Sequence, residues 1–560
     1  MKVTCTYYIV ILYAAISIQL HAVKTVYIPR SQGHAPSMIC MPAYELTAIT
    51  TLNYAQSYKN HLIAEDLFGR DYLTISGSQA PNRNKHDLLA DNFGLAPDFK
   101  SIITFSPKIE NVLLQFYFNK PLDQILSGLY VNIMLPVNYT RWGLNPCEKV
   151  INRGSPYFQN GYMGDTIVTF THAAPLTSSD INQGACNTIT SASSPADPAA
   201  TAANARAYFS GNVITGDILR PLAYNKISWC PLSRTDLAEI IVRLGRNLIS
   251  NERTYLSAFA RASFQTGNKP RPEYLFTPIV GNGHFFELGL GTQGQYRCTH
   301  LDCPTNVTLL WDGSFETLFQ TKQLRTFDFC TQGPLSRYLL LKRLDTAALT
   351  YAHELIEASY VTTFPVLVSR GIQGDLDLKL YIEHKGFTQT FGYALWGTSK
   401  EKICPQFDQP TCPTGGNIYG IKGTSGAYNY VTYITTATVL EGLNATENSS
   451  SIRVPGPIDN PEPLPGTTTY ANVSDGMVIN PAIVAIASNS PLIVGCGSLD
   501  IESAQSPAQL THAFIAEMGY TWEGRHTQPA VLVGASIETA TSNPAELHQW
   551  SVWLKGSVAW

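Results

Sequence analysis

Hydrophobic and polar residues alternate with a period of two along much of the chain. From Asp375 to Glu383, aliphatic side chains occupy every even-numbered position, and mostly charged side chains occupy the odd-numbered ones. Because successive side chains of a strand point to opposite faces, this segment predicts a strand with one apolar and one polar face. A turn at His384 to Gly386 and a second alternating segment from Phe387 to Leu395 complete a predicted hairpin.

The same alternation recurs in many other parts of the chain. It is clearest in residues 112–119, 129–137, 286–291, 307–319, 514–522, 530–539 and 550–560. Segments of about ten residues suit strands that cross a bilayer at a tilt. The pattern therefore predicts an all-β fold, a single transmembrane antiparallel β-barrel of roughly 12 to 16 strands.

One alternating segment, Asp236 to Leu248, also fits an amphipathic helix. The turn residues Asn251 to Arg253 and the alternating run from Leu256 to Phe264 favour a hairpin at this position.

Two long regions lack the alternation and are rich in Ser, Ala, Asn and Pro. They span residues 143–224 and 442–508. Outer-membrane barrels carry long loops on their outer side, so we expect both regions to be long outer loops.

The amino-terminal residues resemble an export signal. A basic start at Lys2 precedes an apolar stretch from Tyr7 to Ile18, and Ala22 offers a small residue for cleavage. An uncleaved anchor would need roughly 20 apolar residues to span a bilayer. We therefore expect a signal peptide over residues 1–22 and a mature barrel over 23–560.

Composition supports a protein that meets lipid on one side. Charged residues make up 14% of the chain, against roughly 25% in a typical soluble domain. The net charge of -4 and the lack of Lys and Arg clusters predict no nucleic-acid partner.

Known catalytic motifs are missing from the sequence, so we predict no enzyme activity, no cofactor and no metal site. Gly289 to Gly294 matches the GxGxxG string of dinucleotide sites. The string continues an alternating strand, and small residues facing a barrel interior account for it more simply.

Eleven cysteines are present, of which Cys5 leaves with the signal peptide. Local disulfides in turn-rich segments, for example Cys298 with Cys303 and Cys404 with Cys412, suit an exported chain better than zinc ligands do. The full pairing stays open at this stage.

The last twelve residues, from Gln549 to Trp560, resemble the C-terminal strand of bacterial outer-membrane porins. That strand ends in an aromatic residue, usually Phe, and its alternating apolar positions are recognised by the barrel-assembly machinery. The matching positions here are Trp550, Val552, Leu554, Val558 and Trp560. The resemblance implies an outer-membrane location, with membrane lipid and the assembly machinery as partners, and it suggests a homo-oligomer.

The polar faces of the predicted strands supply the candidate pore-lining residues. They are Glu239, Arg243, Arg261, Glu287, Asp312, Glu316, Asp377, Lys379 and Glu383. Aromatic residues near predicted strand ends are expected to form girdles at the membrane interfaces: Tyr139, Trp142, Tyr520, Trp522 and Trp550.

These features predict a porin-like channel for passive diffusion of small hydrophilic solutes or ions. Two alternatives stay open. One is a structural or adhesive surface barrel in which internal salt bridges close the lumen. The other is a soluble secreted all-β enzyme or binding protein.

Overall fold

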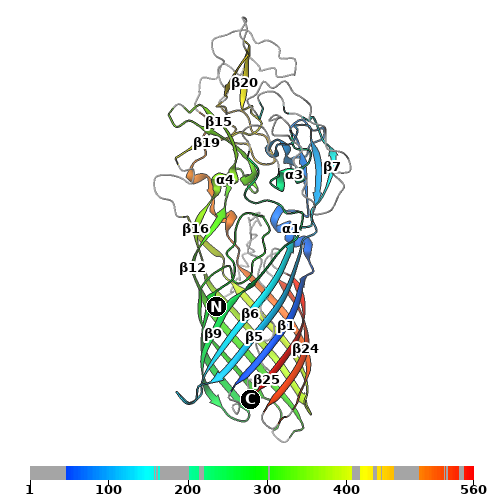
Figure 1. Ribbon diagram of the computed structural model, residues 1–560, viewed down its shortest axis with the longest axis vertical. Helices are drawn as coiled ribbons and strands as arrows, with labels where there is room; N and C mark the ends of the chain where they lie inside the picture. Colours follow the sequence, from blue (N-terminus) through cyan, green and yellow to red (C-terminus); the bar gives the residue numbers. More distant parts are fainter. Residues whose placement is uncertain are drawn as a thin grey trace, which may run out of the picture.

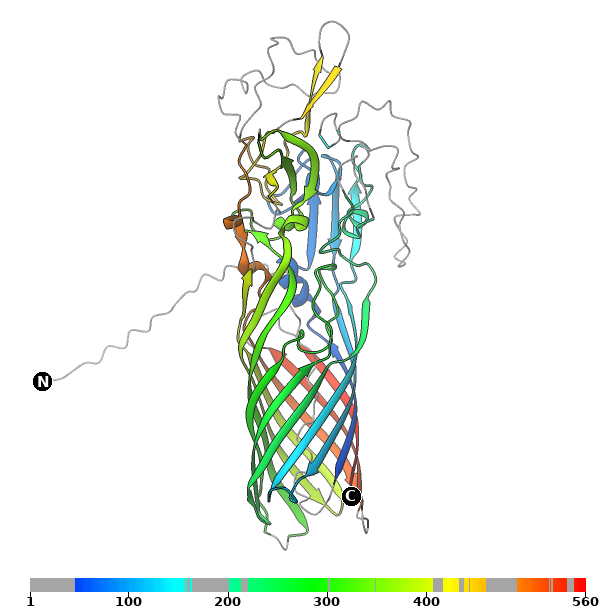
Figure 2. The same cartoon turned by 60° about the vertical axis from the view of Figure 1, so that its left-hand side comes forward.

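The computed structural model describes residues 46–156, 158, 162–163, 201–212, 220–300, 303–347, 349–405, 416–432, 438–442, 444–459, 491–522, 524, 527–540 and 548–560. These residues form a tall β-barrel and a folded cap above one of its ends (Figures 1 and 2).

Twelve antiparallel strands close the barrel. They are β1 (Thr47–Ser57), β5 (Lys108–Pro121), β6 (Leu129–Gly143), β9 (Glu239–Ser250), β10 (Thr254–Gln265), β11 (Glu287–Arg297), β12 (Thr305–Thr326), β16 (Thr363–His384), β17 (Phe387–Thr398), β23 (Gln509–Thr521), β24 (Gln528–Ala540) and β25 (Gln549–Ala559). β1 pairs with β25, and β12 pairs with β16, so each barrel strand has a neighbour on both sides.

The strand interpretation of the sequence is confirmed, and the strand number is the lower limit of the predicted range. The predicted hairpin from Asp375 is formed by β16 and β17, joined by a two-residue turn. Both turn residues, Lys385 and Gly386, have positive φ, as a hairpin turn of this length favours. The ambiguous segment near residue 240 forms β9 and a short strand before it, β8 (Leu232–Leu237), instead of a helix.

The outer face of the barrel is apolar around its circumference. Leu378 on β16 is 39% exposed, whereas its neighbour Lys379 is only 4% exposed. Other strands show the same contrast, with Phe315 on β12, Phe514 on β23 and Leu554 on β25 among the most exposed apolar residues. An exposed apolar surface this extensive is far larger than the patches of soluble monomers and indicates a face made for lipid.

The two ends of the barrel differ (Figure 1). At one end, short turns join β5 to β6, β9 to β10, β11 to β12, β16 to β17 and β23 to β24, and Thr47 pairs there with Ala559. At the other end, the connections between β1 and β5, between β6 and β8, between β12 and β16, and between β18 (Glu401–Pro405) and β23 are long and contribute to the cap. The predicted loop regions 143–224 and 442–508 begin at this capped end.

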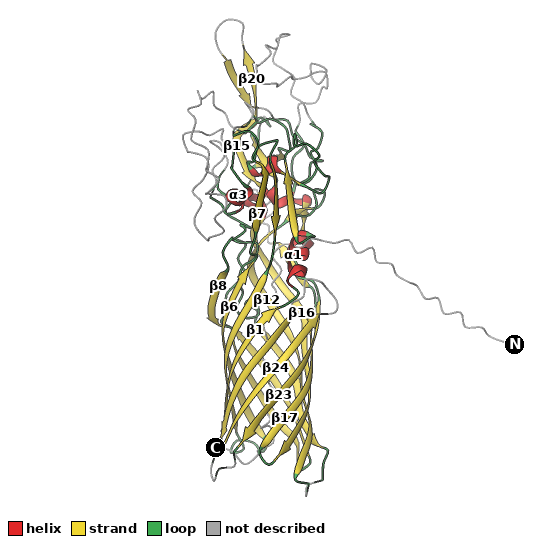
Figure 3. Cartoon of the chain, turned by 90° about the vertical axis from the view of Figure 1, so that its right-hand side faces the viewer, coloured by secondary structure: helices red, strands yellow, loops and turns green. Residues whose placement is uncertain are grey.

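The cap is built from small sheets and short helices (Figure 3). One sheet contains β2 (Tyr72–Ser76), β3 (Leu88–Leu89), β4 (Lys100–Thr104) and β7 (Cys147–Asn152). A second sheet contains β14 (Leu340–Leu344), β15 (Tyr351–Glu357) and β19 (Ile418–Ile421). Two further sheets have two strands each: β13 (Asp328–Phe329) pairs with β22 (Leu499–Asp500), and β20 (Tyr428–Thr432) pairs with β21 (Thr438–Gly442). The helices are α1 (Asn60–Phe68), α3 (Ala205–Phe209) and α4 (Ala358–Thr362).

The cap has an apolar core of its own. Phe93, Phe209 and Tyr338 come from three separate connections and meet there, with ring centroids 5.0 Å apart for the first pair and 5.4 Å for the second. All three are buried. Aromatic contacts of this kind stabilise a globular unit, so the long connections fold together instead of standing as separate loops.

No helix in the described part of the chain is both long enough and apolar enough to cross a membrane. The predicted signal peptide, residues 1–22, lies outside the described residues.

The prediction of an interface girdle is wrong for Trp142. β6 continues beyond the barrel rim, where it pairs with β8, and Trp142 lies on its inward face. The indole is 3% exposed and packs against Phe276 in the cap core, with ring centroids 5.0 Å apart. By contrast, Tyr520 and Trp522 are exposed at the short-turn end of β23, where a girdle is expected.

The expected local disulfides are also wrong. Cys298 and Cys303 are both free and exposed, and Cys404 is free as well, while its expected partner Cys412 lies outside the described residues. The backbone N–H of Cys298 donates to Val307 O at 2.7 Å and so extends the β11–β12 ladder. The geometry of the strand therefore sets the direction in which the Cys298 side chain points. Cys230, which precedes β8, is disulfide-bonded.

The alternation of β16 generates a prediction. Leu378→Arg should lower the free energy of unfolding by about 2–4 kcal/mol if Leu378 lies near mid-membrane, because a charge would face lipid. Asp377→Arg, one residue away on the interior face, is the matched control and should cost much less. Urea titration of the refolded variants in lipid vesicles measures both values, and equal costs would mean that the faces are misassigned.

Candidate functional site

The barrel interior is the candidate functional site, because the charged residues of the wall converge there. Six of the predicted pore-lining residues are buried: Arg243, Arg261, Glu287, Asp312, Glu316 and Lys379. The other three are half-buried on inward faces: Glu239 near the cap end of β9, Asp377 midway along β16, and Glu383 near the short-turn end of β16.

Arg243 and Asp312 form an ion pair between β9 and β12. Arg243 Nη1 donates to Asp312 Oδ2 at 2.8 Å, and both side chains are almost completely buried. The guanidinium also lies 4.4 Å from the ring centroid of Phe259 on β10. A buried guanidinium that has both a carboxylate and an aromatic face is held in one position.

Arg261 on β10 links a carboxylate of the adjacent strand β11 to one of the next strand, β12. Its Nη1 lies 3.4 Å from Glu287 Oε2 and 2.5 Å from Glu316 Oε1. Glu287 also accepts a hydrogen bond from Asn282 Nδ2 at 2.9 Å. One cation between two buried carboxylates leaves negative charge in this part of the interior.

The glycines of the GxGxxG string lie in β11 and make room for this cluster. A Cβ on Gly291 would stand 2.4 Å from the Phe259 ring, and one on Gly289 would stand 2.7 Å from Glu316 Cγ. Because β11 is followed by another antiparallel strand and not by a helix, the dinucleotide interpretation is excluded. The interpretation as small inward residues holds for Gly289 and Gly291, whereas Gly294 lies on the outward face of β11 beneath Trp311.

A second charged cluster on the opposite strands was missed from the sequence. Lys555 Nζ on β25 lies 2.8 Å from Glu517 Oε2 on β23, and Trp553 Nε1 donates to the same oxygen at 2.9 Å. The period of two could have found these residues, because Glu517 alternates with Phe514, Ala516 and Met518, which are exposed. Lys555 likewise follows the exposed Leu554.

Acidic residues outnumber basic ones on the interior faces of the barrel strands. The basic residues are Arg243, Arg261, Arg297, Arg325, Arg370, Lys379 and Lys555, and the acidic residues are Glu239, Glu287, Asp312, Glu316, Asp375, Asp377, Glu383, Glu517 and Glu538. The described interior is therefore polar, with a negative formal net charge, and lies inside an apolar outer wall.

A buried ion triad ties the barrel rim to the cap. Glu401 on β18 lies 3.3 Å from Arg325 of β12 and 3.1 Å from Arg370 of β16, and it accepts a hydrogen bond from the Ser506 backbone N–H at 3.0 Å. Burial alone would raise the pKa of Glu401. The two guanidinium groups outweigh burial and leave this pKa below its ordinary value.

No family model matches the sequence, and no curated protein matches it either. Among solved structures, an outer membrane channel from Pseudomonas putida F1 is 7% identical, with a TM-score of 0.33 over 95% of this chain and 99% of that chain. The translocator domain of the autotransporter NalP from Neisseria meningitidis is 7% identical, with a TM-score of 0.25 over 92% and 88% of the two chains.

The monoaromatic hydrocarbon channel CymD is also 7% identical, with a TM-score of 0.25 over 96% and 94% of the two chains. All three TM-scores are below 0.5, so no functional conclusion follows from these similarities.

The Arg243–Asp312 pair generates a prediction about stability. Arg243→Met should lower the free energy of unfolding by about 3–5 kcal/mol, because it leaves the Asp312 carboxylate buried without its counter-charge. The double variant Arg243→Met/Asp312→Leu removes both charges and should recover most of that loss. Urea titration in detergent micelles measures each variant, and a double variant as unstable as the single one would contradict the pairing.

The Glu401 triad generates a prediction about acid stability. Because its folded pKa is lowered, Glu401 contributes stability that is present above its unfolded pKa of about 4.3 and is lost as the pH falls through the folded value. Glu401→Gln should therefore lower the stability of the cap at pH 7. The stability of this variant should then fall less between pH 7 and pH 3 than that of the unmodified protein. Limited proteolysis of the cap from pH 7 to pH 3 measures this.

The matched control is Glu502→Gln, which removes the exposed pair between Lys400 and Glu502. An exposed pair contributes only about 0–1 kcal/mol, so this variant should resemble the unmodified protein. A Glu401→Gln protein with the same acid profile as the control would contradict the role assigned to the triad.

Proposed function

We propose that the protein is an outer-membrane channel through which small hydrophilic solutes or ions diffuse, with a preference for cations. The observation that carries the proposal is a charged, net acidic interior enclosed by an apolar outer wall. An acidic wall lowers the energy of a cation in the lumen and raises that of an anion.

Polar groups without a protein partner on the inner face support the proposal that water enters the interior. The side-chain amides of Asn53 and Asn138 are buried on the inner face and have no hydrogen-bond partner among the described residues. Buried polar groups are stable when they are hydrogen-bonded, and water supplies such bonds in polar cavities.

The C-terminal strand supports the outer-membrane location. Val552, Leu554, Val558 and Trp560 are exposed on the outer face of β25. These positions match the porin-like signal, so we propose the barrel-assembly machinery and outer-membrane lipid as partners. The short turns at one end and the long connections at the other have the asymmetry typical of outer-membrane barrels.

A surface barrel with a closed lumen is the second candidate function. The burial of Arg243, Arg261 and Lys379 favours it, because side chains that line a wide water-filled pore would be exposed to the lumen. The cap, which has its own aromatic core, would then carry the function of the protein. The apolar outer face gives no support to the alternative of a soluble secreted all-β protein. The oligomeric state and the lack of enzyme activity stay predictions.

Conductance separates the two candidates. The refolded full-length protein in a planar lipid bilayer should show discrete open-channel steps, and in a KCl gradient its reversal potential should indicate preference for K⁺. A protein that is folded, as shown by heat-dependent migration on a gel, yet silent in the bilayer would overturn the channel proposal in favour of the closed barrel.

A charge reversal inside the lumen tests the origin of the selectivity. Asp377→Arg should shift the reversal potential towards anions, because it replaces an inward carboxylate by a cation. Asp71→Arg makes the same charge change on an exposed position of the cap and should leave the reversal potential unchanged. Equal shifts in both variants would mean that the barrel interior does not set the selectivity.

A further inference from the structure

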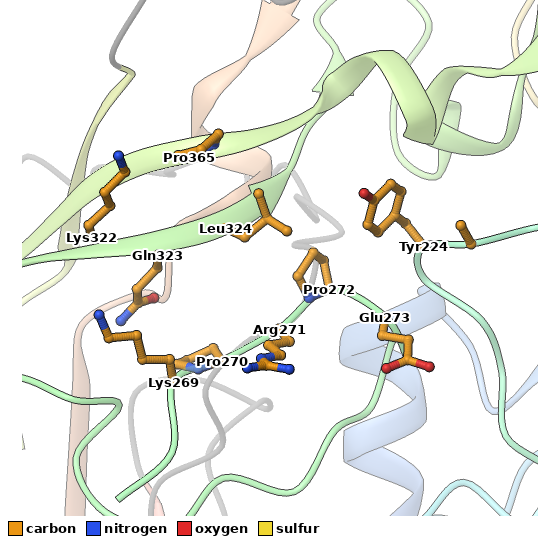
Figure 4. A pocket seen from close by; sticks show the side chains of 11 residues that line it. Tyr224, Lys269, Pro270, Arg271, Pro272, Glu273, Lys322, Gln323, Leu324 and Pro365 are labelled. Carbon is orange, nitrogen blue, oxygen red and sulfur yellow. The ribbon is translucent and has the colours of Figure 1, made fainter. Parts of the chain in front are cut away.

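A pocket of about 640 Å³ lies on the outside of the barrel wall, just beyond the rim (Figure 4). One wall is the extension of β12 past the barrel, with Lys322 and Leu324, next to Pro365 of β16. The opposite wall is the connection between β10 and β11, which contributes residues 269–273.

The pocket lies at the height of a membrane interface. Below it, Phe264, Phe286 and Phe319 form an aromatic row on the outer face, with ring centroids 5.6 and 5.5 Å apart. Aromatic rows of this kind mark the boundary between lipid tails and head groups. Lys322 follows Phe319 by three residues along the tilted strand, which places it at the level of the head groups just above the aromatic row.

The pocket carries excess positive charge. Lys269, Arg271 and Lys322 are exposed, and none of them forms an ion pair with another described residue. The one acidic residue of the lining, Glu273, pairs with Lys226 at 3.1 Å. In Figure 4, Lys269 and Lys322 lie together on one side of the pocket, and Glu273 lies on the other.

Apolar side chains form most of the rest of the lining, to which Gln323 also belongs. Pro270, Pro272, Leu324 and Pro365 contribute ring and methyl groups, and Tyr224 contributes an aromatic face. A small inorganic anion would gain nothing from these walls. A ligand with both a phosphate and an apolar portion would use the cations and the walls together.

We propose that this pocket binds the phosphorylated head group of an anionic lipid in the surrounding leaflet. Lys269, Arg271 and Lys322 contact the phosphate, while the proline and leucine side chains contact the apolar part of the lipid. This site goes beyond the channel function. It requires that the barrel is inserted in a membrane, and it does not require that the barrel conducts.

The experiment uses the full-length protein in uncharged detergent micelles and lipid A, a phosphorylated glycolipid, as the probe. Native mass spectrometry measures the bound fraction over a titration. The variant Lys269→Gln/Arg271→Gln/Lys322→Gln should weaken binding at least about tenfold, because charge-assisted hydrogen bonds to phosphate are lost. Binding of equal affinity in this variant would overturn the proposal.

The matched control is Lys85→Gln/Lys149→Gln/Lys402→Gln, which removes the same charge from exposed positions of the cap and of β18. It should bind within about twofold of the unmodified protein, because dispersed surface charges act weakly. A control that loses as much affinity as the pocket variant would show that net charge, and not the pocket, governs binding.

Two further measurements use the unmodified protein and so do not depend on the folding of a variant. Lipid A from which the phosphates have been removed should bind at least about tenfold more weakly than intact lipid A. Millimolar inorganic phosphate should not displace intact lipid A. Equal binding of the dephosphorylated lipid, or displacement by inorganic phosphate, would overturn the assignment to a lipid head group.

Discussion

Hydrogen bonding between the first and last strands of the sheet is the constraint on which the rest of the structure depends. Lipid offers no partner to a backbone N–H or C=O group, so a sheet that faces lipid must have no open edge. β1 meets β25, and β12 meets β16, and these pairings leave every barrel strand flanked on both sides. Once the sheet is closed, alternate side chains must point either to the outer surface or to a shared interior.

Closure also determines the electrostatics of the interior. A charge on an inward face cannot reach the outer surface, so it needs a partner on another strand or water. Arg243 and Asp312 are 69 residues apart in sequence and meet across the interior. Lys555 finds Glu517 in the same way. The inward-facing ion pairs make the interior polar, and they also fill part of it. For this reason an open channel and a barrel with a closed lumen are the two candidate functions.

The cap follows from the placement of the long connections. They all leave the barrel at one end, so their apolar residues can meet in a single core around Phe93 and Tyr338. Glu401 joins this cap to the rim through Arg325 and Arg370, and the extensions of β12 and β16 that carry these two arginines also form a wall of the outer pocket. Cap, rim and pocket therefore share the same two strands.

The sequence by itself determined the strands, the inward or outward direction of most side chains, and the apolar outer face, because a period of two is a local property that needs no knowledge of the partner strand. It identified Arg243, Arg261 and Glu316 as inward residues for that reason. Only the tertiary structure decided which charges pair, that Trp142 lies in a cap core, that Cys298 and Cys303 stay unlinked, and that Lys269 and Lys322 share one pocket. Those outcomes depend on strand register and on contacts between connections that are distant in sequence. Neither register nor such contacts produce a periodic pattern in the sequence.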